Sequence, residues 1–240
     1  MTASDFRLTE RQIQVVGSFG STADLLEMPT SVILETCDIV EIRLDLIEFG
    51  SSSEAAFQRL HHAGLPLLFT ARRNEEGGAG ALSAEQRITL LEANINYASY
   101  VDIEVASILE MSDLLNELQN RNIPWIASFH DFEKLPNPAL LDSTAQRAKD
   151  AGASAFKIAA KLHSPADLAR LAEFQLADAG LPVATMGMGP LAPSSRLLCA
   201  QCGSVLNYGY LGNTPTAPGQ WEAALLKEAI TRLTAFRMEL

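Results

Sequence analysis

The chain has 240 residues, 48% of them hydrophobic, and a formal net charge of -11 at pH 7. This acidic balance argues against sequence-independent binding to nucleic acid, which needs a basic face. No apolar run approaches the ~20 residues that span a bilayer, and the first 25 residues hold no apolar stretch typical of a signal peptide. We therefore expect a soluble, cytoplasmic protein that binds neither nucleic acid nor membrane.

The three cysteines are Cys37, Cys199 and Cys202. Their odd, low number favours reduced thiols over a disulfide framework. Cys199 and Cys202 form a C-x-x-C pair, but no other cysteine or histidine lies within thirty residues to complete a zinc site. We expect this pair to be two small apolar residues on one helical face, and we expect no metal.

Short apolar runs alternate along the chain with longer segments of helical periodicity. The runs are apolar on both faces, which is typical of parallel strands covered by helices. Eight of them are predicted as strands: Gln14–Gly17, Ile39–Asp45, Pro66–Arg72, Tyr100–Val105, Pro124–His130, Ala155–Ala160, Pro182–Met188 and Ser204–Tyr210.

The segments between the runs carry helix signals. Ser83 followed by Gln86 is typical of a capping box, Ser164-Pro165 puts proline just inside a helix start, and a last helix is predicted over about 220–236. Eight βα units in a chain of this length predict an α/β fold, a (β/α)8 TIM barrel, as a single domain over residues 1–240. An open doubly wound sheet is the competing architecture, but the segment 17–20 lacks its glycine-rich phosphate loop, and no organic cofactor is expected.

Lys157 lies inside one of the apolar runs, and His130 ends the run before it. Burial disfavours a charged amine, so a lysine placed there tends to lose its proton and can attack a ketone. A histidine has the unperturbed pKa for proton transfer near pH 7. Together they predict Schiff-base chemistry, with Glu76 as a carboxylate that could orient the imidazole.

In a barrel, the C-terminal strand ends carry the active site. Each polar residue there also has a purely structural interpretation. Lys157 could reach out to water, and His130 could be a packed core residue. The charges on the runs Ile39–Asp45 and Tyr100–Val105 could form a structural ion network. Their convergence on one end of successive strands favours a functional site. Arginines suit a substrate carboxylate, which predicts a small anionic ketone, and the candidates are Arg43, Arg72 and Arg196.

The chain resembles type I 3-dehydroquinate dehydratase, the Schiff-base enzyme of the shikimate pathway, from about Ile13 to the last helix. The motifs that carry the resemblance are the segments 41–45 (EIRLD), 69–72 (FTAR), 75–78 (EEGG), 102–104 (DIE), 128–132 (SFHDF), 157–159 (KIA), 186–189 (MGMG), 195–196 (SR) and 217–220 (APGQ). The resemblance implies a (β/α)8 barrel that removes water from 3-dehydroquinate to give 3-dehydroshikimate, without a metal and as a homodimer.

The resemblance also implies catalytic roles. Lys157 matches the imine-forming lysine, His130 the general base that returns a proton to the leaving hydroxyl, and Glu76 the carboxylate that pairs with that histidine. Residues that match substrate-binding positions are Glu41, Arg43, Arg72, Arg196, Thr216 and Gln220.

Arg196 matches the arginine that holds the substrate carboxylate, and Gln220 belongs to the loop that closes over the substrate. Ile42, Leu135, Ala192 and Thr216 depart from the family's usual residues. We expect these departures to affect the closing loop and substrate affinity more than the chemistry.

Two other functions fit the same residues. One is a different imine-forming lyase or aldolase that acts on a small keto acid. The other is a non-catalytic barrel that binds quinate-like metabolites. The buried amine beside a base argues against pure binding, because binding alone needs neither group.

Overall fold

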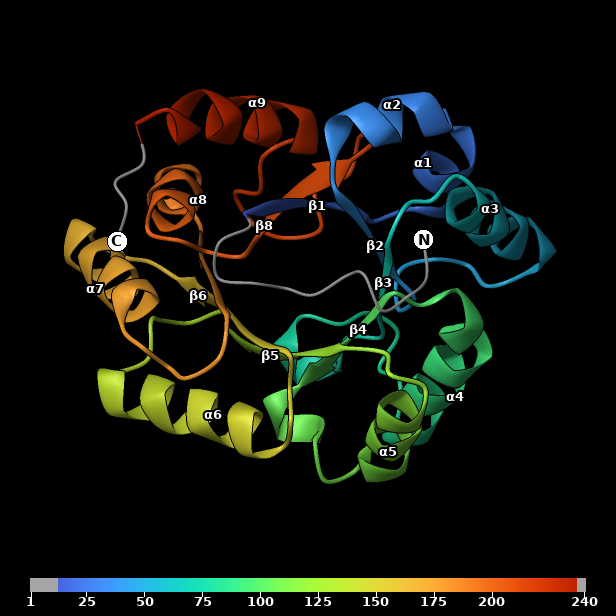
Figure 1. Ribbon diagram of the computed structural model, residues 1–240, viewed down its shortest axis with the longest axis horizontal. Helices are drawn as coiled ribbons and strands as arrows, with labels where there is room; N and C mark the ends of the chain where they lie inside the picture. The colour runs from blue at the N-terminus through green and yellow to red at the C-terminus, as the bar shows by residue number, and fades with distance from the viewer. Residues whose placement is uncertain (1–12, 237–240) are drawn as a thin grey trace.

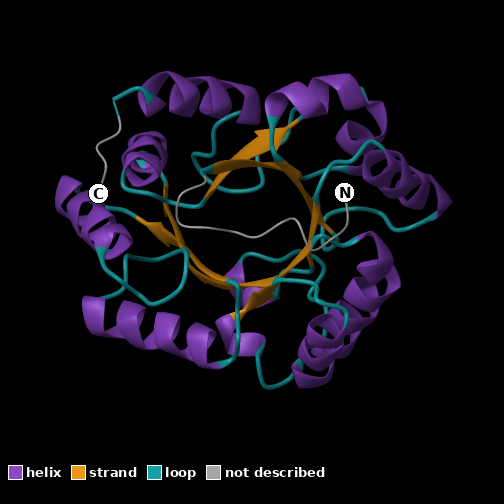
Figure 2. Ribbon diagram, in the orientation of Figure 1, coloured by secondary structure: helices purple, strands orange, loops and turns teal. Residues whose placement is uncertain are grey.

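The computed structural model describes residues 13–236, which form a ring of eight parallel strands surrounded by helices (Figures 1 and 2). The strands are β1 Gln14–Phe19, β2 Ile39–Arg43, β3 Leu67–Thr70, β4 Tyr100–Glu104, β5 Trp125–Asp131, β6 Ala155–Lys161, β7 Val183–Met188 and β8 Leu206–Leu211. Neighbours in the sheet follow the order β7-β6-β5-β4-β3-β2-β1-β8.

The remaining edges of the sheet, β7 and β8, meet through Val205. Its backbone N–H donates to the carbonyl of Val183, at the start of β7, at 3.1 Å. This closes the ring and confirms the predicted (β/α)8 barrel. Residues 1–12 and 237–240 of the predicted single domain lie outside the described residues.

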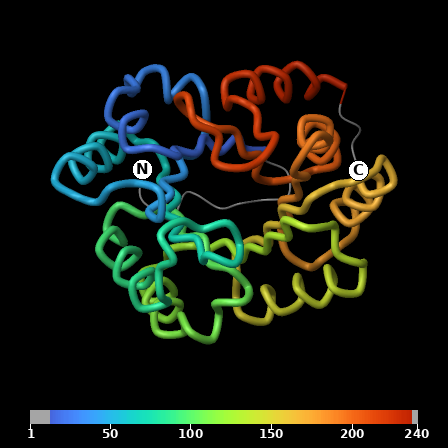
Figure 3. Tube along the Cα trace, turned by 180° about the vertical axis from the view of Figure 1, so that it is seen from behind, coloured from blue at the N-terminus to red at the C-terminus, as the bar shows by residue number. Residues whose placement is uncertain are grey.

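Helices follow the strands in chain order around the barrel, as the view from behind also shows (Figure 3). They are α1 Thr22–Glu27, α2 Thr30–Thr36, α3 Ser51–His62, α4 Ala84–Asn94, α5 Ser112–Asn120, α6 Pro138–Asp150, α7 Pro165–Leu176, α8 Ala192–Gln201 and α9 Ala223–Thr234, with short 3-10 helices η2 Asn74–Glu76, η3 Ile95–Tyr97 and η4 Val105–Ser107. Among residues 13–236, no helix combines the length and apolarity that membrane crossing requires.

The predicted helix starts are present. The Ser83 hydroxyl accepts the backbone N–H of Gln86, and the Gln86 side chain accepts that of Ser83, which completes a capping box. Ser164 caps α7 in the same way, with Pro165 at the first helical position. The last helix, α9, is shorter at both ends than the predicted 220–236.

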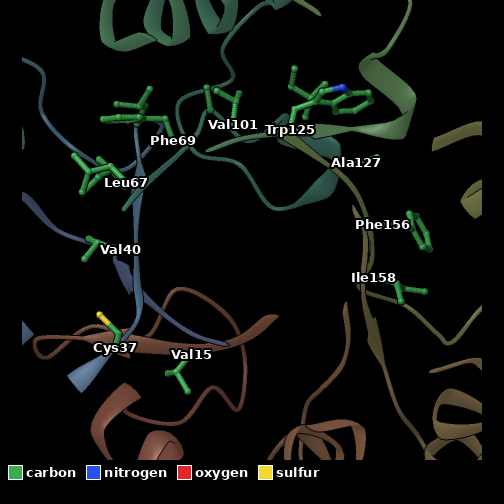
Figure 4. Close-up of a cluster of buried hydrophobic side chains, with 14 of the residues drawn as sticks. Val15, Cys37, Val40, Leu67, Phe69, Val101, Trp125, Ala127, Phe156 and Ile158 are labelled. Carbon is green, nitrogen blue, oxygen red and sulfur yellow. The ribbon is translucent and has the colours of Figure 1, made fainter. Parts of the chain in front are cut away.

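Side chains alternate between the two faces of each strand, and this alternation builds two cores. The outward residues pack between barrel and helices, and Figure 4 shows several of them, including Phe69, Trp125 and Phe156. The inward residues form a separate cluster inside the barrel. A buried inward residue near the start of each of β1 to β6 is apolar: Val16, Ile39, Leu68, Tyr100, Ile126 and Ala155.

The next inward residue on the same six strands is polar. These residues are Ser18, Glu41, Thr70, Asp102, Ser128 and Lys157, and all are buried. The barrel therefore has an apolar floor and, one layer nearer the C-terminal strand ends, a polar ring. Buried polar groups must find partners, so this ring determines where the chemistry can occur.

The outer core should carry much of the stability. Phe156 is fully buried and meets Phe174 of α7 edge to face, with ring centroids 6.2 Å apart. Phe156→Ala should lower the free energy of unfolding by about 3–5 kcal/mol, because a large cavity opens between β6 and α7. Chemical denaturation measures this loss. Leu109→Ala, at a side chain that is 88% exposed, should change it by at most about 0.5 kcal/mol, and equal losses in both variants would contradict this account of the core.

Candidate active site

Lys157 points into the barrel from the middle of β6 and is only 3% exposed. Its ammonium nitrogen Nζ lies 2.6 Å from Oδ2 of Asp102 and 4.4 Å from the centre of the Tyr208 ring. The side chain thus does not extend from the strand end to water. Burial lowers the pKa of Lys157, and Arg72 lowers it further, against the opposing effect of Asp102.

Asp102 is shared between two cations. Its Oδ1 lies 2.9 Å from Nη1 of Arg72 and accepts the hydroxyl of Ser128 at 2.6 Å, while Oδ2 binds Lys157. Burial alone would raise the pKa of Asp102, but Arg72 and then Lys157 outweigh it and hold that pKa below its usual range. The carboxylate therefore stays charged. Because it also pairs with Arg72, it stabilises the ammonium form of Lys157 less than a carboxylate bound to Lys157 alone would.

His130 and Glu76 form a second pair. Oε2 of Glu76 accepts the backbone N–H of His130 at 2.8 Å and lies 3.0 Å from its ring Nδ1. Burial, followed by the positive charges of Arg72 and Lys157, lowers the pKa of His130 well below its usual value. The imidazole is therefore neutral near pH 7. A proton on Nδ1 that faces the carboxylate leaves the lone pair on Nε2, so this ring can act as a base.

Glu76 sits at the end of η2 in a buried position, and burial raises its pKa to about 7. The loop that carries it is held by Asp45, whose two oxygens accept the backbone N–H groups of Arg72 and Ala79 at 3.2 and 3.1 Å. The same carboxylate binds Arg43 at 2.9 and 2.7 Å. Gly78 is required in this loop, since a β-carbon there would lie 2.0 Å from the Arg72 carbonyl oxygen.

Asp45 differs from the sequence-based expectation. Alternation predicts Glu41, Arg43 and Asp45 on one face of a strand that runs to Asp45, whereas β2 ends at Arg43. Asp45 lies beyond the strand and anchors the loop of Glu76. Arg43 joins this anchor, because its Nη2 also donates to the carbonyl of Gly77 at 3.2 Å.

Glu41 lies inside the polar ring. It accepts the hydroxyl of Thr70 at 2.8 Å and also that of Ser18. These two hydroxyls come from the strands on either side of β2, so the sheet register fixes the carboxylate. Glu41 is therefore a rigid acceptor within the barrel.

Arg196 comes from α8 and is almost completely buried. Its Nη1 donates to the carbonyl of Tyr208 at 2.7 Å and contacts Sδ of Met186 at 3.7 Å. Within residues 13–236, Nε of Arg196 has no hydrogen-bond partner and no carboxylate forms a salt bridge with the guanidinium. Burial lowers its pKa below the value usual for arginine. A buried cation with a spare N–H is suited to an anionic ligand.

Thr216 and Gln220 lie in the loop between β8 and α9. Oε1 of Gln220 accepts the backbone N–H of Thr216 at 2.8 Å and its hydroxyl at 2.9 Å. Compared with serine, Thr216 carries an additional methyl group, which lies against Gly20. A β-carbon at position 20 would lie 2.8 Å from this methyl group. The glycine therefore provides the space that threonine needs at this position.

The structure thus gathers seven of the nine predicted site residues in three groups, while Glu41 and Arg196 have partners of their own. Lys157 and Arg72 share Asp102, His130 pairs with Glu76 beside the Arg43 anchor, and Thr216 bonds Gln220 in the last loop. The charges predicted as one network pair separately: Arg43 at the end of β2 binds Asp45, whereas the carboxylates of β4 bind cations from other elements.

Several contributing residues are absent from the predicted site. Tyr208 covers Lys157, Ser128 bonds Asp102, and Arg87 of α4 bonds Glu104. Strand alternation signals the first two as inward residues. For Arg87, the signal is a charged residue in line with Leu91 and Asn94 on the buried face of α4.

The cysteines show no metal arrangement. Cys199 is buried in α8, and Cys202, three residues later, caps the C-terminus of that helix. Burial raises the pKa of Cys199 to about 12. Over the described part of the chain, no three His, Cys, Asp or Glu residues are grouped to hold a metal ion.

Comparison with known proteins gives a consistent result. The family model described as Type I 3-dehydroquinase matches residues 18–236. A curated protein of Methanothrix thermoacetophila named 3-dehydroquinate dehydratase is 33% identical over 221 residues, which cover 92% of each chain. The crystal structure of the 3-dehydroquinate dehydratase from Aquifex aeolicus has a TM-score of 0.79 at 26% identity, covering 93% of this chain and 100% of that one. That from Geobacillus kaustophilus shares the fold, with a TM-score of 0.84 at 24% identity, 95% of this chain and 93% of that one.

The charge of Asp102 should raise the pKa of Lys157. Asp102→Asn removes the nearest anion and leaves Arg72 in place, so the pKa of Lys157 should fall. Titration of 13C-labelled lysine side chains by NMR measures it, with Lys157→Arg to assign the signal among the five lysines. Glu75→Gln, at an exposed carboxylate, serves as the control and should leave the Lys157 pKa unchanged. A rise in Asp102→Asn would contradict the arrangement described.

Proposed function

The chain belongs to the type I 3-dehydroquinase family, and we propose that it dehydrates 3-dehydroquinate to 3-dehydroshikimate through an imine at Lys157, with His130 transferring the proton. The family match makes it a 3-dehydroquinate dehydratase, which is a hydro-lyase. The covalent mechanism and the residue roles are the proposed part. One observation carries them. The buried Lys157 is paired with the carboxylate of Asp102, and His130, whose pKa is lowered, lies in the same mouth of the barrel.

The first step is the attack of neutral Nζ of Lys157 on the ketone carbon. The carbinolamine that forms then loses water and becomes a protonated imine, which withdraws electrons from the neighbouring C–H bond. The Asp102 carboxylate, 2.6 Å from Nζ, stabilises the positive nitrogen of this imine. Arg72 limits that stabilisation in the free enzyme, which keeps the neutral amine accessible.

His130 then acts on the activated C–H. Its neutral ring takes the proton on Nε2, and the electron pair moves into the enamine. The imidazolium returns that proton to the hydroxyl on the next carbon as its C–O bond breaks, so water leaves and the imine re-forms. Hydrolysis of this imine releases the ketone product and restores the amine. Glu76 stabilises the imidazolium between the two transfers, because its carboxylate faces Nδ1.

Arg196 is the best candidate for the substrate carboxylate. Arg43 is bound to Asp45, and Arg72 is bound to Asp102 and Glu104, so their charges are already matched. The guanidinium of Arg196 is buried with an unpartnered Nε. Gln220 and Thr216 lie in the loop that follows β8, and we propose that they contact the substrate when it is bound.

The alternatives are less well supported. Another imine-forming lyase would need the same lysine, but the family match covers residues 18–236 and concerns one activity. A binding protein would gain nothing from a neutral histidine paired to a buried carboxylate. The homodimer implied by the resemblance and the cytoplasmic location expected from the sequence remain predictions.

Borohydride reduction tests the imine. With 3-dehydroquinate present, wild-type protein should gain one covalent adduct at Lys157, measured by peptide mass spectrometry, and should lose activity. Lys161→Arg, four residues along the same strand, should still form the adduct and retain turnover, whereas Lys157→Arg should do neither. Trapping at any other residue, or none in active wild-type protein, would overturn the proposed mechanism.

Arg196→Lys tests the carboxylate site. Lysine keeps the charge but loses the two parallel N–H donors of a guanidinium, so KM should rise about tenfold or more with a smaller change in kcat. Steady-state kinetics separate the two constants. Arg170→Lys, at an ion pair on the surface of α7, should leave both unchanged. An unchanged KM in Arg196→Lys would remove this residue from the substrate site.

A further inference from the structure

We propose that Arg87 is a positioning residue of the dehydratase reaction: it holds Glu104, and through Glu104 it fixes Arg72 against Asp102, the carboxylate that binds Lys157. The proposal rests on the function proposed above and extends it to a residue of α4, outside the barrel strands. Arg87 is 3% exposed, as deeply buried as Lys157 itself.

Both terminal nitrogens of the Arg87 guanidinium are hydrogen-bonded. Nη1 donates to Oε2 of Glu104 at 2.9 Å, and Nη2 donates to Oγ of Ser107 at 3.1 Å and to the carboxylate of Glu110. A buried arginine is costly unless its charge is paired, and here two carboxylates pair it, although its Nε has no hydrogen-bond partner. These partners therefore determine both where the guanidinium lies and how Glu104 is turned.

Glu104 joins this arginine to the site. Its other oxygen, Oε1, accepts Nη1 of Arg72 at 3.0 Å and the backbone N–H of Arg73 at 2.9 Å. One oxygen thus faces α4, and the other holds the start of the loop that carries Glu76. Without Arg87, Glu104 would keep only the contacts to Arg72 and Arg73.

The local structure explains why Arg87 is well placed. It lies in the first turn of α4, directly after the Ser83–Gln86 capping box, and its backbone N–H donates to the Ser83 carbonyl at 3.0 Å. The capping box satisfies backbone donors of this first turn and so stabilises it. The side chain is therefore held at both ends, by the cap and by Glu104.

The arrangement alternates in charge from α4 to the amine. The order is Arg87, Glu104, Arg72, Asp102, Lys157, and each contact lies between 2.6 and 3.0 Å. Arg72 divides its Nη1 between Glu104 and Asp102. If Arg87 no longer neutralises Glu104, Glu104 should attract Arg72 more strongly, and Asp102 should become available to Lys157 alone.

The loss of the Arg87 charge and the release of Asp102 should both change the pKa of Lys157 in the same direction. A positive charge is lost near the site, and the Asp102 carboxylate acts more fully on the lysine, so the pKa of Lys157 should rise and less neutral amine should exist at pH 7. The titratable and charged groups that face Lys157 are Asp102, Arg72, Glu41, His130 and Tyr208. None of these is altered by substitution of Arg87, which makes the readout specific.

Arg87→Gln keeps a side-chain donor for Glu104 but removes the charge. The pKa of Lys157, measured by NMR titration of 13C-labelled lysines, should rise by about 0.5 unit, less than the 1–3 units of a directly contacting charge. The acid limb of kcat/KM should move by the same amount, which corresponds to a loss of about threefold at neutral pH that high pH restores. Arg87→Lys, which keeps the charge, should restore most of the wild-type pH profile.

Arg59→Gln is the matched control. Arg59 is a partly buried arginine of α3 that donates to the carbonyls of Met28 and Leu25 and to Thr30. Its substitution therefore lowers stability and removes one positive charge, but at a position away from the site. Its pH profile should superimpose on that of the wild type. An unshifted Lys157 titration in Arg87→Gln, or an equal shift in Arg59→Gln, would overturn the proposal.

The two proposals can fail separately. The NMR titration needs no substrate, so it tests Arg87 even if borohydride traps nothing. Conversely, trapping at Lys157 together with an unshifted Arg87→Gln titration would leave the Schiff-base reaction standing and remove only the role of Arg87.

Discussion

The site depends on one interaction, the sharing of the buried Asp102 carboxylate between Arg72 and Lys157. A lysine inside a barrel would be too costly to keep charged without a partner, and an exclusive partner would keep it charged at all useful pH values. Asp102 avoids both outcomes because Arg72 shares it, with contacts of 2.9 Å to Arg72 and 2.6 Å to Lys157. The result is an amine whose pKa lies below its usual value although an anion touches it.

This sharing is possible because of the barrel geometry. Parallel strands of a closed ring bring every second residue to the interior, and the register sets Thr70 beside Asp102 and Ser128 beside Lys157. Hydroxyl groups therefore separate the charged residues. Ser128 contacts both Asp102 of β4 and Arg72, which lies just after β3, so it ties these two side chains together.

Much of the fold could be predicted from the sequence, since continuous apolar runs mark buried parallel strands and strand parity identifies the inward residues. The ends of the strands could not. The run Pro66–Arg72 predicts a strand to Arg72, but β3 ends at Thr70, because Asp45 takes the backbone N–H of Arg72 and Glu104 that of Arg73. Those carboxylates come from the segment after β2 and from β4, and only the folded register brings them there.

In the site, too, some residues can be predicted from the sequence and others only from the folded structure. Lys157 and His130 are recognisable locally, as polar residues in or after an apolar run, and motif resemblance identifies Glu76. The partner of Lys157 is not recognisable in this way. Asp102 lies 55 positions away in the chain, and its neighbour Glu104 looks equivalent in sequence, yet one binds the amine and the other binds Arg87. The choice follows from barrel stagger and from a helix outside the barrel.

The arginines show how a fold separates structural charges from functional ones. Arg43, Arg72 and Arg87 each meet a carboxylate, so their charges are neutralised inside the folded chain. Arg196 is also buried, but it bonds a carbonyl and contacts a thioether, and among residues 13–236 no carboxylate forms a salt bridge with it. A buried cation without a counter-ion destabilises the fold by up to several kcal/mol. If the proposed role of Arg196 holds, an anionic substrate would remove that penalty on binding, so the same burial that weakens the empty protein would strengthen its hold on a carboxylate.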